Sequence, residues 1–319
     1  MKQLAAALAL LSVSTAAMAQ SGAFPVKPIR MVLPVPPGGS IDTVMRVIAP
    51  RMSETIGQSV VLEMRAGAST NLGTELVARA PGDGYTLLAN TVGLVANVSL
   101  FSKLGYDPEK DFAAVSLIAS SPSMIAVHPS VPAKNVRELL ALAKKNPATI
   151  KFGTAGAGGL THLAVELLAS QTGTKFAHVP YKGGGPALIA LMSGEVDMSA
   201  LAVVAAVGFV NSSRMRVLAV TSPKRLAMLP NIPTVIESGV QYQFESWVGV
   251  VAPVATPAPV IKILNDHLVR AARSPDVVDR FGKDGADVVA SSPEQFKKVI
   301  TDEVAMWARV IKQAGIKAD

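Results

Sequence analysis

A strand followed by a glycine-rich turn and a helix recurs along this chain, and this repeated unit limits the folds available to it. The unit occurs at 29–56, 149–173 and 175–193, and in weaker form at 59–80. Short β-rich runs that alternate with longer helical patterns are typical of α/β layering around a largely parallel sheet. Because the chain has 319 residues, and domains average roughly 150 residues, we predict two α/β domains.

The same patterns predict the individual elements. Residues Val115–Val127 favour one long extended segment that is broken near Pro122, since proline interrupts strand pairing. Residues 223–239 contain two prolines and favour a loop. The other predicted strands lie at 29–35, 59–65, 85–90, 149–154, 175–181, 195–201 and 215–222, and the clearest helices at 41–56, 135–145, 161–173, 257–273 and 293–314.

The N-terminus has the three parts of a secretory signal. Lys2 supplies positive charge, Leu4–Val13 is an almost unbroken apolar run, and Ala17-Met18-Ala19 fits a cleavage site. The apolar run is too short to span a bilayer, and no later segment is predicted as a span. We expect residues 1–19 to be removed, which leaves a soluble periplasmic protein with no membrane insertion. A buried N-terminal helix is the alternative.

Composition excludes several kinds of chemistry. The chain has no Cys, which removes disulfides, thiolate metal sites and Cys nucleophiles. The four His residues lack zinc-site spacing, and no P-loop, nucleophile elbow or ordered dinucleotide fingerprint occurs. The net charge of +7 is modest, and it suits acidic small molecules better than a nucleic-acid scaffold. We therefore expect no catalysis, no metal, no cofactor and no nucleic-acid partner.

Each glycine-rich turn places a helix N-terminus at the carboxyl end of a strand. Such an end carries unpaired backbone N–H groups and a partial positive charge. Two clusters of these turns lie about a hundred residues apart, which favours two facing lobes with a cleft suited to an anion. For any single turn, a simple strand-to-helix connection is the alternative.

Polar side chains at the first two turns are candidates for ligand contacts. Ser40 and Asp42 flank the first helix start, where Asp42 could cap the helix, hold a water or orient a ligand amine. Ser69 and Thr70 begin the second helix, and their hydroxyls could donate to a carboxylate or cap the helix. The capping roles are the structural alternatives.

The later turns carry a second set of candidates. Thr154 and His162 flank the glycine-rich loop that follows a strand. A His at a helix N-terminus is poorly placed for the helix dipole unless an anion lies beside it, and a core His satisfied by backbone is the alternative. Tyr181 ends the next strand, and Lys182 after it could attract acids or be solvated.

Several motifs occur in a fixed order along the chain. They are Pro34–Asp42, Arg65–Gly73, Asp83–Leu88, Tyr106–Phe112, Gly153–Leu163, Val179–Gly183, Arg216–Ser222, Leu229–Thr234 and Trp247–Pro253. With these motifs the sequence resembles the Bug-type extracytoplasmic solute-binding receptors of tripartite tricarboxylate transporters, from the signal almost to the C-terminus.

The resemblance implies the type II periplasmic binding-protein fold, an α/β fold in which two domains are joined by two crossing strands with the ligand cleft between them. The crossings would lie near Val115–Pro122 and Val217–Ser222. Domain 1 would then comprise residues 20–121 and 222–319, and domain 2 residues 122–221.

The resemblance also implies a function. A receptor of this kind captures a small organic carboxylate, holds it by backbone N–H groups of the first loop and of the loop before His162, and delivers it to the large and small membrane subunits of a transporter. Together with the polar residues at the turns, the candidate ligand-binding residues are Pro37, Gly38, Gly39, Ser40, Asp42, Ala68, Ser69, Thr70, Thr154, Ala155, Gly158, Gly159, His162 and Tyr181.

Three positions depart from the family pattern. Ala66 stands where Pro is usual, and Ser69-Thr70 replace Gly-Gly, which adds two hydroxyls and bulk at the cleft. Ser199–Val203 stands where a more polar segment is usual and makes the second lobe's wall more apolar. We expect a carboxylate with a less polar remainder rather than a tricarboxylate.

Two other functions compete with transport. The same fold serves sensory systems, so a signalling receptor is one alternative. An exported hydrolase that uses Ser69 or Thr154 is the other, but the sequence shows no general base near either residue.

Overall fold

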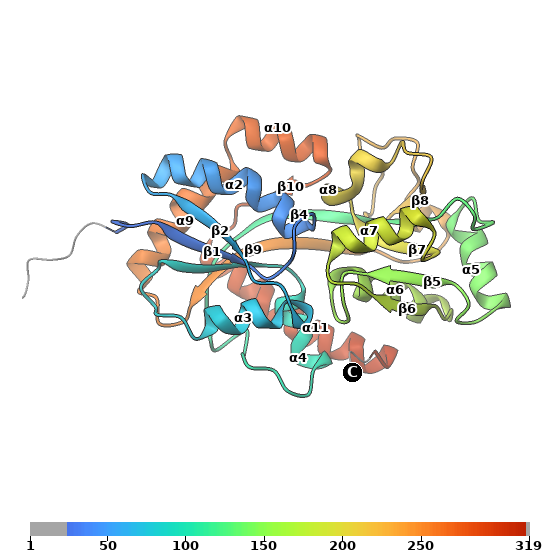
Figure 1. Cartoon of the computed structure of the whole chain (residues 1–319), viewed down its shortest axis with the longest axis horizontal. Coiled ribbons are helices and arrows are strands. Elements are labelled where there is room, and N and C mark those ends of the chain that lie inside the picture. The colour runs from blue at the N-terminus through green and yellow to red at the C-terminus, as the bar shows by residue number, and fades with distance from the viewer. Residues whose placement is uncertain (1–23, 317–319) are drawn as a thin grey trace, which may run out of the picture.

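The computed structural model describes residues 24–316. The predicted signal at residues 1–19 lies outside the described residues. Figure 1 shows an elongated molecule in which a twisted sheet runs the length of the described chain, with helices on both of its faces.

The elements alternate as the repeated unit predicts, and their bounds are as follows. The first part contains β1 Ile29–Leu33, α2 Ser40–Ile56, β2 Val60–Met64, the 3-10 turn η2 Ala68–Thr70, α3 Asn71–Ala78, β3 Thr86–Asn90 and α4 Gly93–Leu100. The middle part contains β4 Phe112–Val127, α5 Val136–Lys145, β5 Lys151–Thr154, α6 Leu160–Thr172, β6 Ala177–Pro180, α7 Gly184–Ser193, β7 Met198–Ala202, α8 Val203–Ala206, η3 Val207–Phe209 and β8 Arg216–Val220. The last part contains η4 Ile236–Ser238, β9 Glu245–Pro253, α9 Ala258–Ala272, α10 Pro275–Asp284, β10 Asp287–Val288 and α11 Pro293–Ala314.

The sheet is mixed, with the strand order β2-β1-β3-β9-β4-β7-β5-β6 and with β8 and β10 also paired to β4. Strand β1 is parallel to β2 and β3, and β5 is parallel to β6 and β7. The pairs that involve β4 and β9 are antiparallel. The prediction of a largely parallel sheet therefore holds for the two ends and is wrong for the middle, because β4 leads out of one end and β9 leads back into it.

Strand β4 is the longest element of the sheet and connects its two ends. Its first part, Phe112–Pro122, pairs with β9, and its second part, Ser123–Val127, pairs with β7. The predicted break near Pro122 is wrong, because β4 is one continuous strand from Phe112 to Val127. Pro122 lies where the pairing with β9 ends. The next amide, that of Ser123, donates to Thr221 Oγ1 at 2.8 Å, so the missing proline N–H falls at the change of partner, where its absence is tolerated.

The helices form because their apolar residues recur at helical spacing. In α2 the residues Ile41, Val44, Met45 and Ile48 are buried, which is the i, i+3, i+4, i+7 pattern of one apolar face. The helix ends at Gly57, whose φ of 77° is the left-handed conformation that glycine adopts freely.

Helices cover both faces of the first half of the sheet. In Figure 1, α2 and α10 lie above it, and α3, α4 and α11 lie below. Helix α9 packs on α2 and β4, and α11 packs on α4 and β4. In the second half, α6 and α7 both contact β5 and β7. None of the described helices combines the length and apolarity needed to cross a bilayer.

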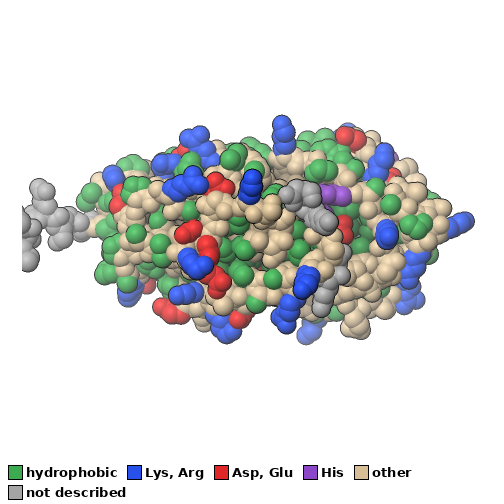
Figure 2. Space-filling view, turned by 90° about the horizontal axis from the view of Figure 1, so that it is seen from below, with side chains coloured by type: hydrophobic (Ala, Val, Ile, Leu, Met, Phe, Trp, Pro, Cys, Tyr) green, Lys and Arg blue, Asp and Glu red, His purple; other side chains and the backbone are tan. Residues whose placement is uncertain are grey.

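Charged side chains are spread over the surface. On the face drawn in Figure 2, Lys and Arg lie along the whole length of the molecule and are not gathered into one stripe. Several acidic residues pair with basic neighbours one helical turn away, as Lys262 does with Asp266. Pairs of this exposed kind contribute little to stability, so the fold depends on its buried core.

The contact between β9 and α11 gives a test of this packing. A Cβ at Gly249 would overlap the ring of Phe296, which is fully buried. We expect Gly249→Ala to lower the free energy of unfolding by about 1–3 kcal/mol, because a packed core has no room for an added methyl group. Urea unfolding measures the change. Gly282→Ala in α10 is the matched control, since a Cβ there meets nothing within 4 Å; an equal loss in both variants would contradict the packing argument.

Candidate ligand-binding site

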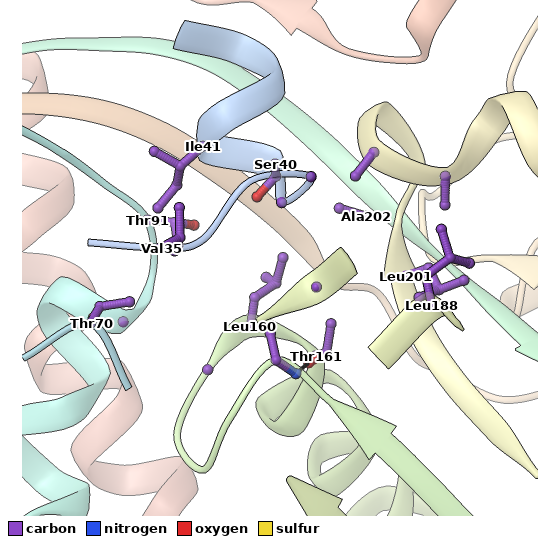
Figure 3. Close-up of a pocket in the computed structure, with 18 of the residues that line it drawn as sticks. Val35, Ser40, Ile41, Thr70, Thr91, Leu160, Thr161, Leu188, Leu201 and Ala202 are labelled. Carbon is purple, nitrogen blue, oxygen red and sulfur yellow. Dashed lines mark hydrogen bonds between the residues drawn. The ribbon is translucent and has the colours of Figure 1, made fainter. Parts of the chain in front are cut away.

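A cavity lies where several helices begin. Its wall takes residues from the starts of α2, α6 and α7 and from the segments before α3 and α4. Figure 3 shows Val35, Ile41 and Thr91 on one side of this space, and Leu188 and Leu201 across from them. The two halves of the sheet thus both contribute to one cavity.

The first loop brings Gly38, Gly39 and Ser40 to the cavity wall. Gly39 is the N-cap of α2, and no side chain caps the helix, so the first-turn N–H groups lack intrahelical acceptors. The Ser40 hydroxyl oxygen points towards the cavity in Figure 3. This arrangement offers donors to an anion at the start of α2.

Asp42 supports this loop from behind. Its Oδ2 accepts the Gly38 N–H at 2.9 Å, and Arg46 Nε lies 2.8 Å from its Oδ1. The carboxylate is buried and does not line the cavity. Asp42 therefore does not cap the first turn of α2; its hydrogen bond fixes the position of Gly38.

The glycine-rich loop between β5 and α6 is held by side chains. Thr161 Oγ1 accepts the Ala155 N–H at 2.7 Å, and Thr154 Oγ1 accepts the Gly156 N–H at 3.3 Å. His162 Nδ1 accepts the Gly158 N–H at 2.9 Å. These amides are occupied within the protein, so the donors left for a ligand are the first-turn amides of α6.

His162 belongs to a stack of rings that are buried or partly buried. It is 3% exposed, and its ring lies parallel to that of His178 at a centroid distance of 3.9 Å. His178 in turn stacks on Phe152 and lies 2.7 Å from Thr154 Oγ1. Of the two roles left open by the sequence, His162 has the structural one: a core histidine that bonds a backbone amide.

Burial and a neighbouring charge lower the pKa of His178. Burial disfavours the His178 cation and the neighbouring His162 repels it, and together they lower the pKa of His178 to about 4. The Glu166 carboxylate lies 3.7 Å from His162 Nε2. His178 is therefore uncharged near neutral pH.

The turn before α7 closes the cavity against the first loop. A Cβ at Gly185 would lie 3.1 Å from the Pro37 carbonyl oxygen, and one at Gly184 would lie 3.6 Å from Gly39 Cα. Gly183 has a φ of 128°, a conformation open mainly to glycine. Glycines at this turn thus allow the backbones of the two lobes to meet beside the cavity.

The segment before α3 is strained. Ala68, Ser69 and Thr70 have φ values of 45°, 53° and 80°, and left-handed residues other than glycine carry a penalty of about 1–3 kcal/mol each. Asn97 Nδ2 donates to the Ser69 carbonyl at 2.9 Å, and Thr74 Oγ1 donates to the Thr70 carbonyl at 2.8 Å. Buried side chains therefore hold in place a conformation for which Gly-Gly would be relaxed.

The predicted site residues fall into four groups. Those that line the cavity are Gly38, Gly39, Ser40, Ser69, Thr70, Ala155 and Gly159. Ala68 and Tyr181 line an adjoining open recess together with Lys182. Asp42, Thr154, Gly158 and His162 lie behind the wall, and Pro37 lies exposed on the first loop and lines neither space.

Other lining residues have weaker sequence signals. Thr91 directly follows strand β3, and Gly184 lies in a glycine-rich turn, so both sit where strand ends and turns favour ligand contacts. Leu188, Leu201 and Ala205 also line the cavity. In the sequence their apolar pattern cannot be separated from that of an ordinary core.

No charged side chain lines the cavity. Its described wall contains no Lys, Arg, His, Asp or Glu, and no three metal-binding side chains gather anywhere in the described chain. A negative charge placed here would be met by backbone amides at helix starts. The cavity is therefore suited to binding an anion.

Two α/β lobes around a cleft lined by helix N-termini define the class of periplasmic solute-binding proteins. Residues 44–316 match the family model TctC, the tripartite tricarboxylate transporter family receptor. The chain belongs to this family, which is the family that its motifs resemble.

Individual relatives agree with this assignment. The chain is 34% identical to protein BugT of Bordetella pertussis over 95% of this chain and 94% of that protein. The solved structure of periplasmic binding protein BugD is 34% identical with a TM-score of 0.88, and covers 92% of this chain and 99% of its own. Rpa4515 of R. palustris, solved with adipate, is 35% identical with a TM-score of 0.89 and the same coverage.

The partly buried His178 predicts a pH dependence of stability. The pKa of His178 is lowered to about 4 in the folded protein. As the pH falls, the His178 side chain of the unfolded chain therefore binds a proton near pH 6.5, whereas that of the folded protein binds one only near pH 4. The free energy of unfolding should therefore fall as pH drops from about 6.5 to about 4. Urea unfolding across this range measures the slope. In His178→Gln the slope should be shallower, and an unchanged slope would contradict the assignment.

Proposed function

We propose that this protein is a periplasmic receptor that captures a small organic carboxylate in the cavity and delivers it to the membrane subunits of a tripartite tricarboxylate transporter. The observation that carries the proposal is the convergence of the α2, α6 and α7 N-termini on a cavity without charged side chains. Adipate, a carboxylate, is bound in the related Rpa4515 structure.

The energetics of such a site are favourable. A hydrogen bond to a charged group contributes about 1.5–3 kcal/mol, and a helix N-terminus contributes about 0.3–1 kcal/mol when exposed. Micromolar affinity needs about 8 kcal/mol. Several hydrogen bonds donated by the backbone amides of Ser40 and Ile41 on one side, and of Leu160 and Thr161 on the other, give a binding free energy in this range after the entropy of association is subtracted.

The proposed contacts follow the cavity wall. Ser40 and the first-turn amides of α2 and α6 meet the carboxylate, and Ser69 and Thr70 border the same space. Asp42 and His162 are positioning residues, because each bonds a loop amide from behind the wall.

We further propose that the chain closes as two domains, residues 20–121 with 222–319 and residues 122–221. Strand β4 passes between them. One refinement follows from hydrogen bonds: Arg137 Nε donates to the Ser238 carbonyl, and Tyr242 OH donates to the Ala164 carbonyl. Residues 222–244 therefore lie against the second domain, and the return crossing falls at the start of β9.

The same proposal includes export without catalysis. Residues 1–19 direct the chain to the periplasm and are removed there. The Ser and Thr hydroxyls at the cavity wall have no lining His, Asp or Glu that could act as a general base. A bound acid would then be released unchanged.

A substitution at the start of α2 tests the carboxylate site. In Ser40→Asp the new carboxylate occupies the position proposed for the ligand's charge. Asp in the first turn of a helix is stabilising by about 0.3–1 kcal/mol, so the fold should be preserved. We expect affinity for organic acids to fall at least about 100-fold by charge repulsion, measured by isothermal titration calorimetry.

The neutral variant Ser40→Asn is the matched control and should lose less than about tenfold, since one hydrogen bond is at stake. Equal binding by Ser40→Asp and the wild type would place the carboxylate elsewhere. Loss of acid uptake by cells that carry Ser40→Asp, with uptake retained for Ser40→Asn, would tie the cavity to transport.

A further inference from the structure

One end of the cavity is apolar. Leu188 of α7, Leu201 and Ala202 of β7, and Ala205 and Ala206 of α8 line it. In Figure 3, Leu188, Leu201 and Ala202 lie at the end away from Thr70. These five side chains carry no polar atom, and four of them are at most 7% exposed. We name this group of five residues the apolar end.

Backbone donors are also scarce at the apolar end. Strand β7 passes directly into α8, which has only four residues. The Val204 N–H donates to Ser121 Oγ at 3.4 Å, away from the cavity. A carboxylate placed among these side chains would lose its hydration without gaining hydrogen bonds, which is strongly unfavourable.

The opposite end offers little to a second carboxylate. The Thr91 hydroxyl already pairs with Ser246 Oγ at 3.0 Å. The Thr70 hydroxyl has almost no accessible surface, although no described atom bonds it. Neither end carries a basic side chain. The middle of the cavity, between the α2 and α6 starts, therefore suits one anionic group, and the nearest basic side chain, Lys182, lines the adjoining recess rather than the cavity.

We propose that the ligand is a monocarboxylate with an apolar tail or ring, and that Leu188, Leu201 and Ala205 determine this specificity. The inference rests on the proposed carboxylate function and names its substrate class. It sets this chain apart from the adipate-bound relative, whose ligand carries two carboxylates. The alanines of the apolar end leave room for the tail, and Leu188 and Leu201 contact it.

Calorimetric titration of the mature protein with butanoate, octanoate, 3-phenylpropanoate, adipate and citrate tests the proposal. Each buried methylene adds up to about fourfold in affinity. Octanoate or 3-phenylpropanoate should therefore bind at least about tenfold more tightly than butanoate, and adipate and citrate should bind no more tightly than butanoate. Tightest binding of adipate or citrate would overturn the inference while leaving the carboxylate receptor intact. Binding of none of the acids would overturn the proposed function itself, and the inference with it.

A pair of variants locates the specificity. Ala205 is only partly buried, so Ala205→Leu fills the apolar end with little risk to folding. It should weaken octanoate and 3-phenylpropanoate at least about tenfold and leave butanoate within about threefold. Ala308→Leu, on the exposed face of α11, is the control and should bind all five acids as the wild type does. A uniform loss for all acids in Ala205→Leu would show a general effect and refute the role of the apolar end.

Discussion

The unpaired amides at helix starts are the constraint on which the rest of this molecule depends. A helix cannot satisfy its own first-turn N–H groups, and here the starts of α2, α6 and α7 border the same cavity. Side chains could have capped them, but α2, α6 and α7 have no side-chain cap. The caps are glycines instead, which leaves space for an outside acceptor. The surrounding residues then serve to hold those glycine loops still.

Support of the loops explains several buried polar groups. Asp42 fixes Gly38, Thr161 fixes Ala155, and His162 fixes Gly158, each through one hydrogen bond to a loop amide. A buried acceptor that loses its partner is penalised by about 1–3 kcal/mol, so each loop and its support stabilise one another. This coupling makes the wall rigid, and a rigid wall binds a ligand with less loss of conformational entropy.

Local patterns predicted the parts of the fold and site that are themselves local. Glycine-rich turns between a strand and a helix identified the loops and Ser40, and the family resemblance added Gly38, Gly39, Ala155 and Gly159, all of which line the cavity. The pairing of strands that are distant in the sequence could not be predicted from local patterns. No strand was predicted at β9 and no helix at α4 or α10. The break at Pro122 was wrong because the change of strand partner there depends on distant residues, Glu245 of β9 and Ala202 of β7. The support roles of Asp42 and His162 likewise depend on side-chain directions that spacing does not fix.

The strained segment Ala68–Thr70 bears on where selectivity can arise. Among these three left-handed residues, Asn97 and Thr74 hold the carbonyls of Ser69 and Thr70, so this wall has little freedom to adapt to a ligand. The opposite wall is built differently, from small and aliphatic side chains that can change size without disturbing a hydrogen bond. Differences in ligand preference among receptors with this cavity are therefore expected to come from the β7–α8 side. In the proposed function, the helix starts between the two walls hold the carboxylate, whichever tail the β7–α8 side accepts.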